Sequence, residues 1–294
     1  MVLRIGENLN VIAKKIGEAL KERDPVPIRE MAEAEAKAGV DLIDINLGPA
    51  RKAGAELMDW VVKTVQEVVP HIPLSLDTTN VEAMEAGLKA HKGRPLINSI
   101  SARPERMEAL VPLAKKYNAP YIALMLGVEG IPRDANERGL LAAEQLAKAA
   151  EFGIPEEDLW IDPIVLPINT QQIQVQGCTE FIMMMKDIAP TCKSTCGLSN
   201  ISNGAPGHLR GILNRTYLIM IKRYGMYSAI VDAFDPEMAA ICQDKMPGLE
   251  ALVHKVMDGE AVDMAKLSKE EVEYIKTARV LLGQTLYSDS WLEL

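Results

Sequence analysis

Short apolar runs alternate along this chain with longer stretches in which apolar residues recur every three or four positions. The short runs are typical of buried β-strands, and the longer stretches predict amphipathic helices. Eight such strand–helix units, at a spacing of roughly 30 residues, predict a parallel sheet closed into a (β/α)8 barrel in a single α/β domain. The expected strands lie at residues 3–10, 40–48, 72–80, 94–99, 120–126, 158–167, 195–200 and 228–233.

The expected helices follow these strands with short loops between them. They lie at residues 12–24, 27–39, 55–69, 81–91, 104–117, 136–153, 180–189, 208–225, 236–245 and 270–285. Residues 249–273 exceed what a minimal unit requires, and we expect there an extra helix, a polar turn around Gly259 and a charged helix start. This insertion could cover a barrel edge, contact another copy of the chain, or lie in solvent.

Polar residues stand where the expected strands end. Seven of the eight strands end in Asn or Asp, and only the fifth, which runs into Met125, does not. The carboxyl ends of barrel strands meet at one mouth, where active sites lie. Carboxylates and amides with almost no cations suit a neutral, donor-rich heterocycle better than a phosphate. The residues are Asn8, Asn10, Asp44, Asn46, Asp77, Asn80, Asn98, Asp162, Asn200 and Asp232.

A pterin ring fits such a mouth. It presents adjacent N–H donors together with acceptors, and an ionised Asp only accepts hydrogen bonds whereas an Asn both donates and accepts. Asp77, Asn98, Asp162 and Asn200, on four expected strands of one rim, supply the complementary set. Each charge-assisted bond contributes roughly 1.5–3 kcal/mol.

Several of these residues also have a purely structural interpretation. Asp44 could bond the amides of its own loop, and Asn46 and Asp232 could support other residues. Asp77 could cap the helix that begins near Val81, although Asn80 is better placed for that role.

Composition and the remaining motifs exclude several classes of function and of binding site. The 294 residues carry a net charge of −9, which argues against binding to nucleic acid or an anionic membrane. We find no apolar run that would span a bilayer and no signal segment, so we expect a cytoplasmic protein. The four cysteines lack metal-site spacing, so no bound metal is expected. The chain has no G-x-x-x-x-G-K-[ST] loop and no D-x-H-x-x-G motif, by which many methyl-carrier proteins hold cobalamin.

At these strand ends the chain resembles a known family. The segments GENLN, IDINLGPA, LSLDTTN, LINS, WIDPIVLP, GLSNIS, LNRTY and QTLYSDS are similar to those of the methyltetrahydrofolate:corrinoid protein methyltransferases, which are pterin-binding TIM barrels. The likeness extends over the whole chain except for residues 249–273. It implies methyl transfer between nitrogen 5 of methyltetrahydrofolate and the cobalt of a cobalamin carried by a separate corrinoid protein. The direction stays open, and a homodimer is implied.

The resemblance also assigns residues. It implies that Asp77, Asn98 and Asp162 hold the pterin ring and that Asn200 lies beside nitrogen 5, where it would donate a hydrogen bond that strengthens as charge develops. Gly197 and Ser199 flank Asn200 in the loop that approaches the pterin. Four more positions match the pocket with less defined roles, namely Glu7, Asn10, Asp44 and Asn46.

Three other functions compete with this one. Dihydropteroate synthase shares the pterin pocket but needs an Arg-Lys pair after the seventh strand and an Arg-x-His at the eighth, where this chain has GLSNIS and IVDAF. A folate-binding module without catalytic activity is a second alternative. Methyl transfer to homocysteine generally uses a zinc–thiolate site, and none is recognisable here.

Overall fold

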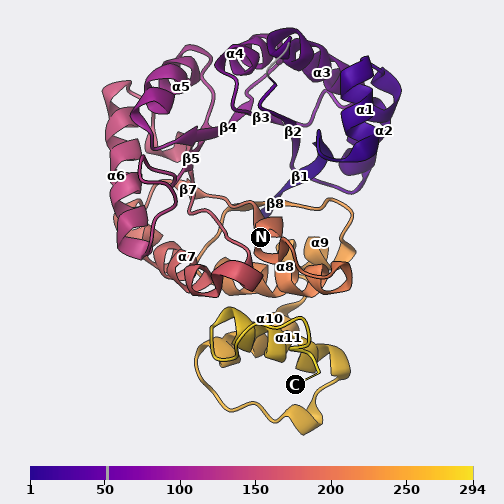
Figure 1. Cartoon of the computed structure of the whole chain (residues 1–294), viewed down its shortest axis with the longest axis vertical. Helices are drawn as coiled ribbons and strands as arrows, with labels where there is room; N and C mark the ends of the chain where they lie inside the picture. The colour runs from indigo at the N-terminus through magenta and orange to yellow at the C-terminus, as the bar shows by residue number, and fades with distance from the viewer. Residues whose placement is uncertain (51–52, 294) are drawn as a thin grey trace.

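The structure is a computed structural model that describes residues 1–50 and 53–293. Its centre is an eight-stranded parallel sheet in the order β7-β6-β5-β4-β3-β2-β1-β8, with helices around the outside (Figure 1). The predicted (β/α)8 barrel is therefore confirmed. The strands are β1 (Leu3–Asn10), β2 (Leu42–Gly48), β3 (Leu74–Thr78), β4 (Leu96–Ser101), β5 (Tyr121–Leu124), β6 (Leu159–Asp162), β7 (Lys193–Ser194) and β8 (Ser228–Val231).

The helices follow the strands in sequence. They are α1 (Lys14–Glu22), α2 (Pro25–Lys37), α3 (Gly54–Val68), α4 (Val81–Ala90), α5 (Pro104–Lys116), α6 (Ala135–Glu151), α7 (Ile168–Ile188), α8 (Gly207–Lys222), α9 (Pro236–Cys242), α10 (Pro247–Met257) and α11 (Lys269–Leu281), with single 3-10 turns at η1 (Glu156–Asp158), η2 (Leu198–Ser202) and η3 (Met264–Lys266). In the described part of the chain, no helix combines the length and apolarity that crossing a membrane requires.

The barrel closes between β7 and β8 by sparse contacts. Gly197 and Ile230 form an isolated parallel bridge, and Ile230 N donates to Cys196 O at 2.8 Å. Ser194 adds side-chain contacts, because its Oγ accepts from Tyr227 N at 2.9 Å and its carbonyl accepts from Ser228 Oγ at 3.1 Å. This seam is the weakest part of the sheet, and η2 follows it directly.

The seventh strand differs from the expectation. The predicted strand at residues 195–200 is wrong in its position, because β7 is only Lys193–Ser194 and residues 198–202 form the 3-10 turn η2. The turn begins where Asn200 N donates to Gly197 O at 3.2 Å. A local i to i+3 bond thus replaces the ladder, so Asn200 stands on a turn above the sheet and not on a strand.

The helix before that strand is longer than predicted. The expected helix at residues 180–189 is only the second half of α7, which starts at Ile168 and has a non-helical residue at Gln171. Polar residues such as Gln172 obscure its start, yet that side chain donates to Val280 O and Thr285 O, both at 2.7 Å. Contacts with the C-terminal segment therefore fix the first turns of α7.

The C-terminal helices form an outer layer over α8. Figure 1 shows α10 and α11 outside the barrel, beyond α8. Val253 of α10, Ile275 of α11 and Leu218 of α8 belong to one apolar cluster. Trp291 is 1% exposed in the same cluster, and its Nε1 donates to Thr277 Oγ1 at 3.0 Å. Residues 247–273 comprise α10, a turn at Gly259, η3 and the start of α11.

Candidate active site

The interior of the barrel is apolar at one end and polar at the other. Ile5, Leu42, Leu96, Ile122 and Trp160, one from each of five strands, form a separate buried cluster. Because side chains on a strand alternate, the residues two positions further along face the same interior. These are Glu7, Asp44, Asn98, Leu124 and Asp162. Four of the five are polar, and β5 supplies the apolar exception that the sequence predicted.

Asp44 lies at the centre of the polar layer. Its Oδ1 accepts from Ser75 Oγ at 2.6 Å and from Asn98 Nδ2 at 3.0 Å. Since β3 lies between β2 and β4, the second bond crosses the barrel interior. Burial raises the pKa of Asp44 to about 6. The alternative that Asp44 bonds the amides of its own loop is thus wrong, because Asp44 orients the Asn98 amide.

Asp77 and Asn46 form a second pair on neighbouring strands. Asn46 Nδ2 donates to the Asp77 carboxylate, and Asn46 Oδ1 accepts from Gly48 N at 2.9 Å. Both ends of the Asn46 amide are therefore engaged, so this residue supports Asp77. Burial, followed by the nearby charge of Asp44, holds the pKa of Asp77 well above its usual range.

Asp162 anchors two backbone segments. Its Oδ1 accepts from Ile164 N at 2.8 Å, and its carboxylate also accepts from the backbone of Gly197. Burial raises the pKa of Asp162 to about 6. Ile164 has φ +65°, which is unfavourable for a β-branched residue and costs on the order of 1–3 kcal/mol. Such conformations cluster at functional sites, where the surroundings enforce them.

A buried arginine behind β6 helps to hold the backbone at Ile164 in this conformation. Arg138 of α6 is 0% exposed, and its Nε donates to Pro163 O at 2.8 Å. Its Nη2 donates to Gln174 Oε1 at 3.1 Å. Arg138 thus clamps the turn that follows Asp162. The strand ends alone did not reveal this cation.

Asn200 stands at the mouth on η2. Its side chain is exposed and folds over Gly197, where an added Cβ would lie 3.0 Å from Asn200 Nδ2. An alanine at this position would require the Asn200 amide to move by a few tenths of an ångström. Ser199 Oγ donates to Glu7 Oε1 at 2.6 Å. Gly197, Ser199 and Asn200 therefore lie together, between Asp162 on one side and Glu7 on the other.

The remaining strand-end residues make local contacts. Asn10 Oδ1 accepts from Ile12 N at 3.0 Å, so Asn10 closes its own turn and has no described bond to the central acids. Asn80 caps α4, as the sequence predicted, because its Oδ1 accepts from Ala83 N at 2.9 Å. Asp232 is exposed and accepts from Asn8 Nδ2 at 2.9 Å.

Two charged groups near the mouth were not predicted. Glu35 of α2 is 0% exposed, its Oε1 accepts from Asn8 N at 3.0 Å, and burial raises its pKa to about 8. The register between β1 and β2 shifts between Gly6 and Leu9, so Glu35 satisfies an amide that the ladder leaves free. Arg210 of α8 donates through Nε to Ser202 Oγ at 3.2 Å, and its charge acts on Glu7. The mouth therefore has one helix-borne acid and one helix-borne cation beside it.

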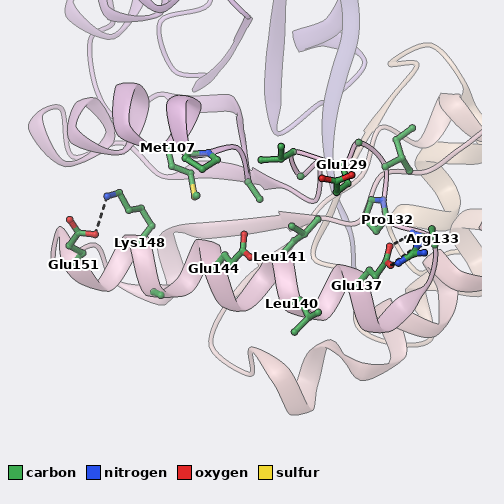
Figure 2. Close-up of a pocket in the computed structure, with 17 residues that line it drawn as sticks. Met107, Glu129, Pro132, Arg133, Glu137, Leu140, Leu141, Glu144, Lys148 and Glu151 are labelled. Carbon is green, nitrogen blue, oxygen red and sulfur yellow. Dashed lines mark hydrogen bonds and ion pairs between the residues drawn. The ribbon is translucent and has the colours of Figure 1, made fainter.

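A surface groove of about 920 Å³ lies elsewhere, between α5 and α6. Figure 2 shows Met107, Leu140 and Leu141 among the side chains that line it. Its cations are engaged in ion pairs, Arg133 with Glu137 and Lys148 with Glu151. None of the acids of the barrel mouth lines it. Among the described residues, no group of three or more His, Cys, Asp or Glu is placed to hold a metal ion.

Comparison with known proteins identifies the family. The profile of the family described as "Pterin binding enzyme" matches residues 6–232. The chain belongs to this family. The match runs from within β1 to just beyond β8 and includes the carboxyl end of each of the eight strands.

Two proteins are similar in sequence to most of the chain. The methylcorrinoid:tetrahydrofolate methyltransferase of Eubacterium limosum is 29% identical over 255 residues, which is 85% of this chain and 93% of that protein. The methionine synthase of Mycobacterium leprae (strain TN) is 28% identical over 244 residues, 79% of this chain but only 20% of that protein.

The solved structure of dihydropteroate synthase from Thermus thermophilus in complex with 6HMPPP is also similar. The TM-score is 0.60 at 20% identity, covering 85% of this chain and 94% of that one. This likeness places the pterin-binding barrel among known folds and carries no statement about its reaction.

Proposed function

We propose that this protein transfers a methyl group between nitrogen 5 of methyltetrahydrofolate and the cobalt of a cobalamin held by a separate corrinoid protein. The observation that carries the proposal is the similarity to methylcorrinoid:tetrahydrofolate methyltransferase over 85% of the chain. The polar mouth, built from Asp44, Asp77, Asn98 and Asp162, agrees with a ligand rich in N–H donors. The direction of transfer and the homodimer implied by the family remain predictions.

In this proposal Asp77, Asn98 and Asp162 hold the pterin ring. Asp77 and Asp162 accept hydrogen bonds from ring N–H groups, while Asn98, held through Nδ2 by Asp44, turns its carbonyl oxygen to the ligand. Burial raises the pKa values of Asp44 and Asp162 to about 6, and the same burial strengthens hydrogen bonds between these residues and a ligand.

Asn200 has the catalytic role. When methyl leaves, the electron pair of the N5–C bond stays on nitrogen 5, which ends as N–H in tetrahydrofolate after taking up one proton. In the opposite direction nitrogen 5 loses that proton and gains the methyl. An amide N–H of Asn200 that bonds nitrogen 5 most strongly as this charge develops lowers the barrier in either direction. The corrinoid cobalt accepts or supplies the methyl.

The test is the variant Asn200→Ala. We expect turnover to fall about 100-fold, the effect of removing one transition-state donor, while the dissociation constant for methyltetrahydrofolate changes less than about threefold. Asn203→Ala is the matched control, since Asn203 is an exposed residue of the same type that follows η2. Equal losses of turnover and affinity would make Asn200 a binding residue only.

Dihydropteroate synthase activity is the alternative, and the segments GLSNIS and IVDAF, which lack the cations that this reaction needs, argue against it. Incubation with pterin diphosphate and p-aminobenzoate tests it directly. Formation of dihydropteroate would replace the proposed methyl transfer. The absence of product would leave the methyltransferase and the non-catalytic folate-binding module, which the assay on Asn200→Ala separates.

A further inference from the structure

Glu7 is an acid of the barrel mouth that the proposed reaction does not use. It lies on β1, two residues beyond Ile5, and its side chain is partly buried in the polar layer. Its Oε1 accepts from Ser199 Oγ at 2.6 Å, a short bond typical of an ionised acceptor. Ser199 is the residue before Asn200, so Glu7 reaches the segment that carries the proposed catalytic amide.

That segment has little regular structure of its own. η2 is a single 3-10 turn of five residues, a conformation with poorer hydrogen-bond geometry than an α-helix. It follows the seam, where β7 and β8 share no regular ladder and are joined by the isolated Gly197–Ile230 bridge, the bond from Ile230 N to Cys196 O and the contacts of Ser194. Its position therefore depends on side-chain contacts with the barrel.

These contacts come from two sides. At the start of the segment, the backbone of Gly197 donates to the Asp162 carboxylate at the end of β6. In its middle, Ser199 donates to Glu7 on β1, which is separated from β6 by β7, the seam and β8. At its end, Ser202 Oγ donates to Ser199 O and accepts from Arg210, both at 3.2 Å. The bond from Ser199 to Glu7 therefore holds the segment from the far side of the seam, and we call this bond the tether.

We infer that Glu7 is a positioning residue for methyl transfer, which in its ionised state holds Ser199 and thereby fixes the Asn200 amide over the pterin. The inference rests on the proposed function. Neutral Glu7 is a weaker acceptor and can itself donate, so it no longer imposes one position on Ser199. Glu7 acts through Ser199 and has no contact with the reacting atoms.

The surroundings of Glu7 make this tether sensitive to pH near neutrality. Burial is the main cause that raises the pKa of Glu7 to about 7, and the bond from Ser199 opposes it. Asp232 on the loop after β8 and Asp44 on β2 raise it further, whereas Arg210 on α8 lowers it. Glu35 on α2 is a further titratable neighbour, and its own pKa is raised to about 8. Ionisation, and with it the tether, is lost as the pH falls through about 7.

The experiment measures turnover and methyltetrahydrofolate affinity against pH for wild type, Glu7→Gln, Ser199→Ala and the double variant. We expect each single variant to lower turnover about tenfold at alkaline pH, with affinity nearly unchanged, and to abolish the rise of turnover at about pH 7. Because both residues act through one contact, the turnover of the double variant should be about tenfold below that of the wild type, the same loss as in each single variant, and not about 100-fold below it. The inference would be overturned if the turnover losses of the two single variants multiplied in the double variant, or if Glu7→Gln kept the pH profile of the wild type.

A second readout does not require activity. In NMR spectra of the wild-type protein, the backbone amides of Ser199 and Asn200 should shift with a midpoint at about pH 7, and in Glu7→Gln this titration should vanish. Wild-type protein that titrates but transfers no methyl would refute the proposed function and leave the tether intact. Wild-type protein that transfers methyl without this titration would refute the tether alone.

Discussion

Replacing Glu35 with Gln tests the account of the buried acids beneath the mouth. The Glu35 side chain is fully buried, its Oε1 accepts from Asn8 N, and its Oε2 has no hydrogen-bond partner among the described residues. Gln keeps the oxygen that accepts from Asn8 and removes the charge. The substitution therefore isolates the free-energy cost of ionising a carboxyl group at this position.

The size of the effect follows from the pKa. Burial raises the pKa of Glu35 from 4.5 to about 8. The folded state thus binds the proton more tightly than the unfolded state, so Glu35 favours folding below about pH 4.5, and this advantage disappears as the pH rises to about 8. The full difference corresponds to about 5 kcal/mol, of which about 3 kcal/mol is lost by pH 7.

Urea unfolding across this range is the assay. The free energy of unfolding of Glu35→Gln relative to wild type should increase by about 1.4 kcal/mol per pH unit between about pH 5 and about pH 8. Glu33→Gln is the control, because Glu33 is an exposed residue on the same helix, and its difference from wild type should not change with pH. A difference for Glu35→Gln that is equally flat would refute the reasoning.

Three further substitutions test the packing that supports the mouth. Gly6→Ala places a Cβ 2.4 Å from Glu35 Oε1, so it should cost about 1–3 kcal/mol in urea unfolding, and an unchanged midpoint would mean that Glu35 moves freely. Asn80→Ala removes the cap of α4 and should cost about 0.5–2 kcal/mol, whereas Asn80→Asp, which can also cap, should recover most of it. Trp291→Ala empties a buried position against α11 and should cost about 3–5 kcal/mol in thermal unfolding; a loss under about 1 kcal/mol would show that the C-terminal segment is not docked.

The sequence was sufficient for the architecture because local pattern and global fold agree. Each strand is an apolar run between helices, and the alternation of side chains carries a strand-end polar residue into the barrel interior. Asp44, Asp77 and Asp162 accordingly lie in or beside the polar layer. The apolar end of β5, at Leu124, was equally readable.

The seventh strand could not be located in the same way. The segment from Thr195 to Asn200 has the composition of a strand, but its hydrogen bonds are decided by the seam and by the turn at Gly197. Whether a short apolar run pairs with a neighbouring strand depends on tertiary contacts, which the spacing of apolar residues in the sequence does not reveal. Asn200 was therefore placed at the correct mouth but on the wrong kind of element.

The charged residues of the helices could have been found from the helix patterns, although not from the strand ends. On α2 the buried positions Ile28, Ala32 and Glu35 form one stripe, so an acid occupies an apolar position. On α6 Arg138 likewise falls in the buried stripe that includes Ala135 and Ala142. A charged residue in the buried stripe of a barrel helix predicts a contact with the strand behind it. Its partner, whether Asn8 N or Pro163 O, requires the structure.

The most direct measurement is methyl exchange between methyltetrahydrofolate and free cob(I)alamin, followed by absorbance in the presence and absence of the protein. We expect the protein to accelerate formation of methylcob(III)alamin and Asn200→Ala to remove most of that acceleration. A rate equal to that of the protein-free mixture, with methyltetrahydrofolate bound, would contradict methyl transfer and make this barrel a folate-binding module.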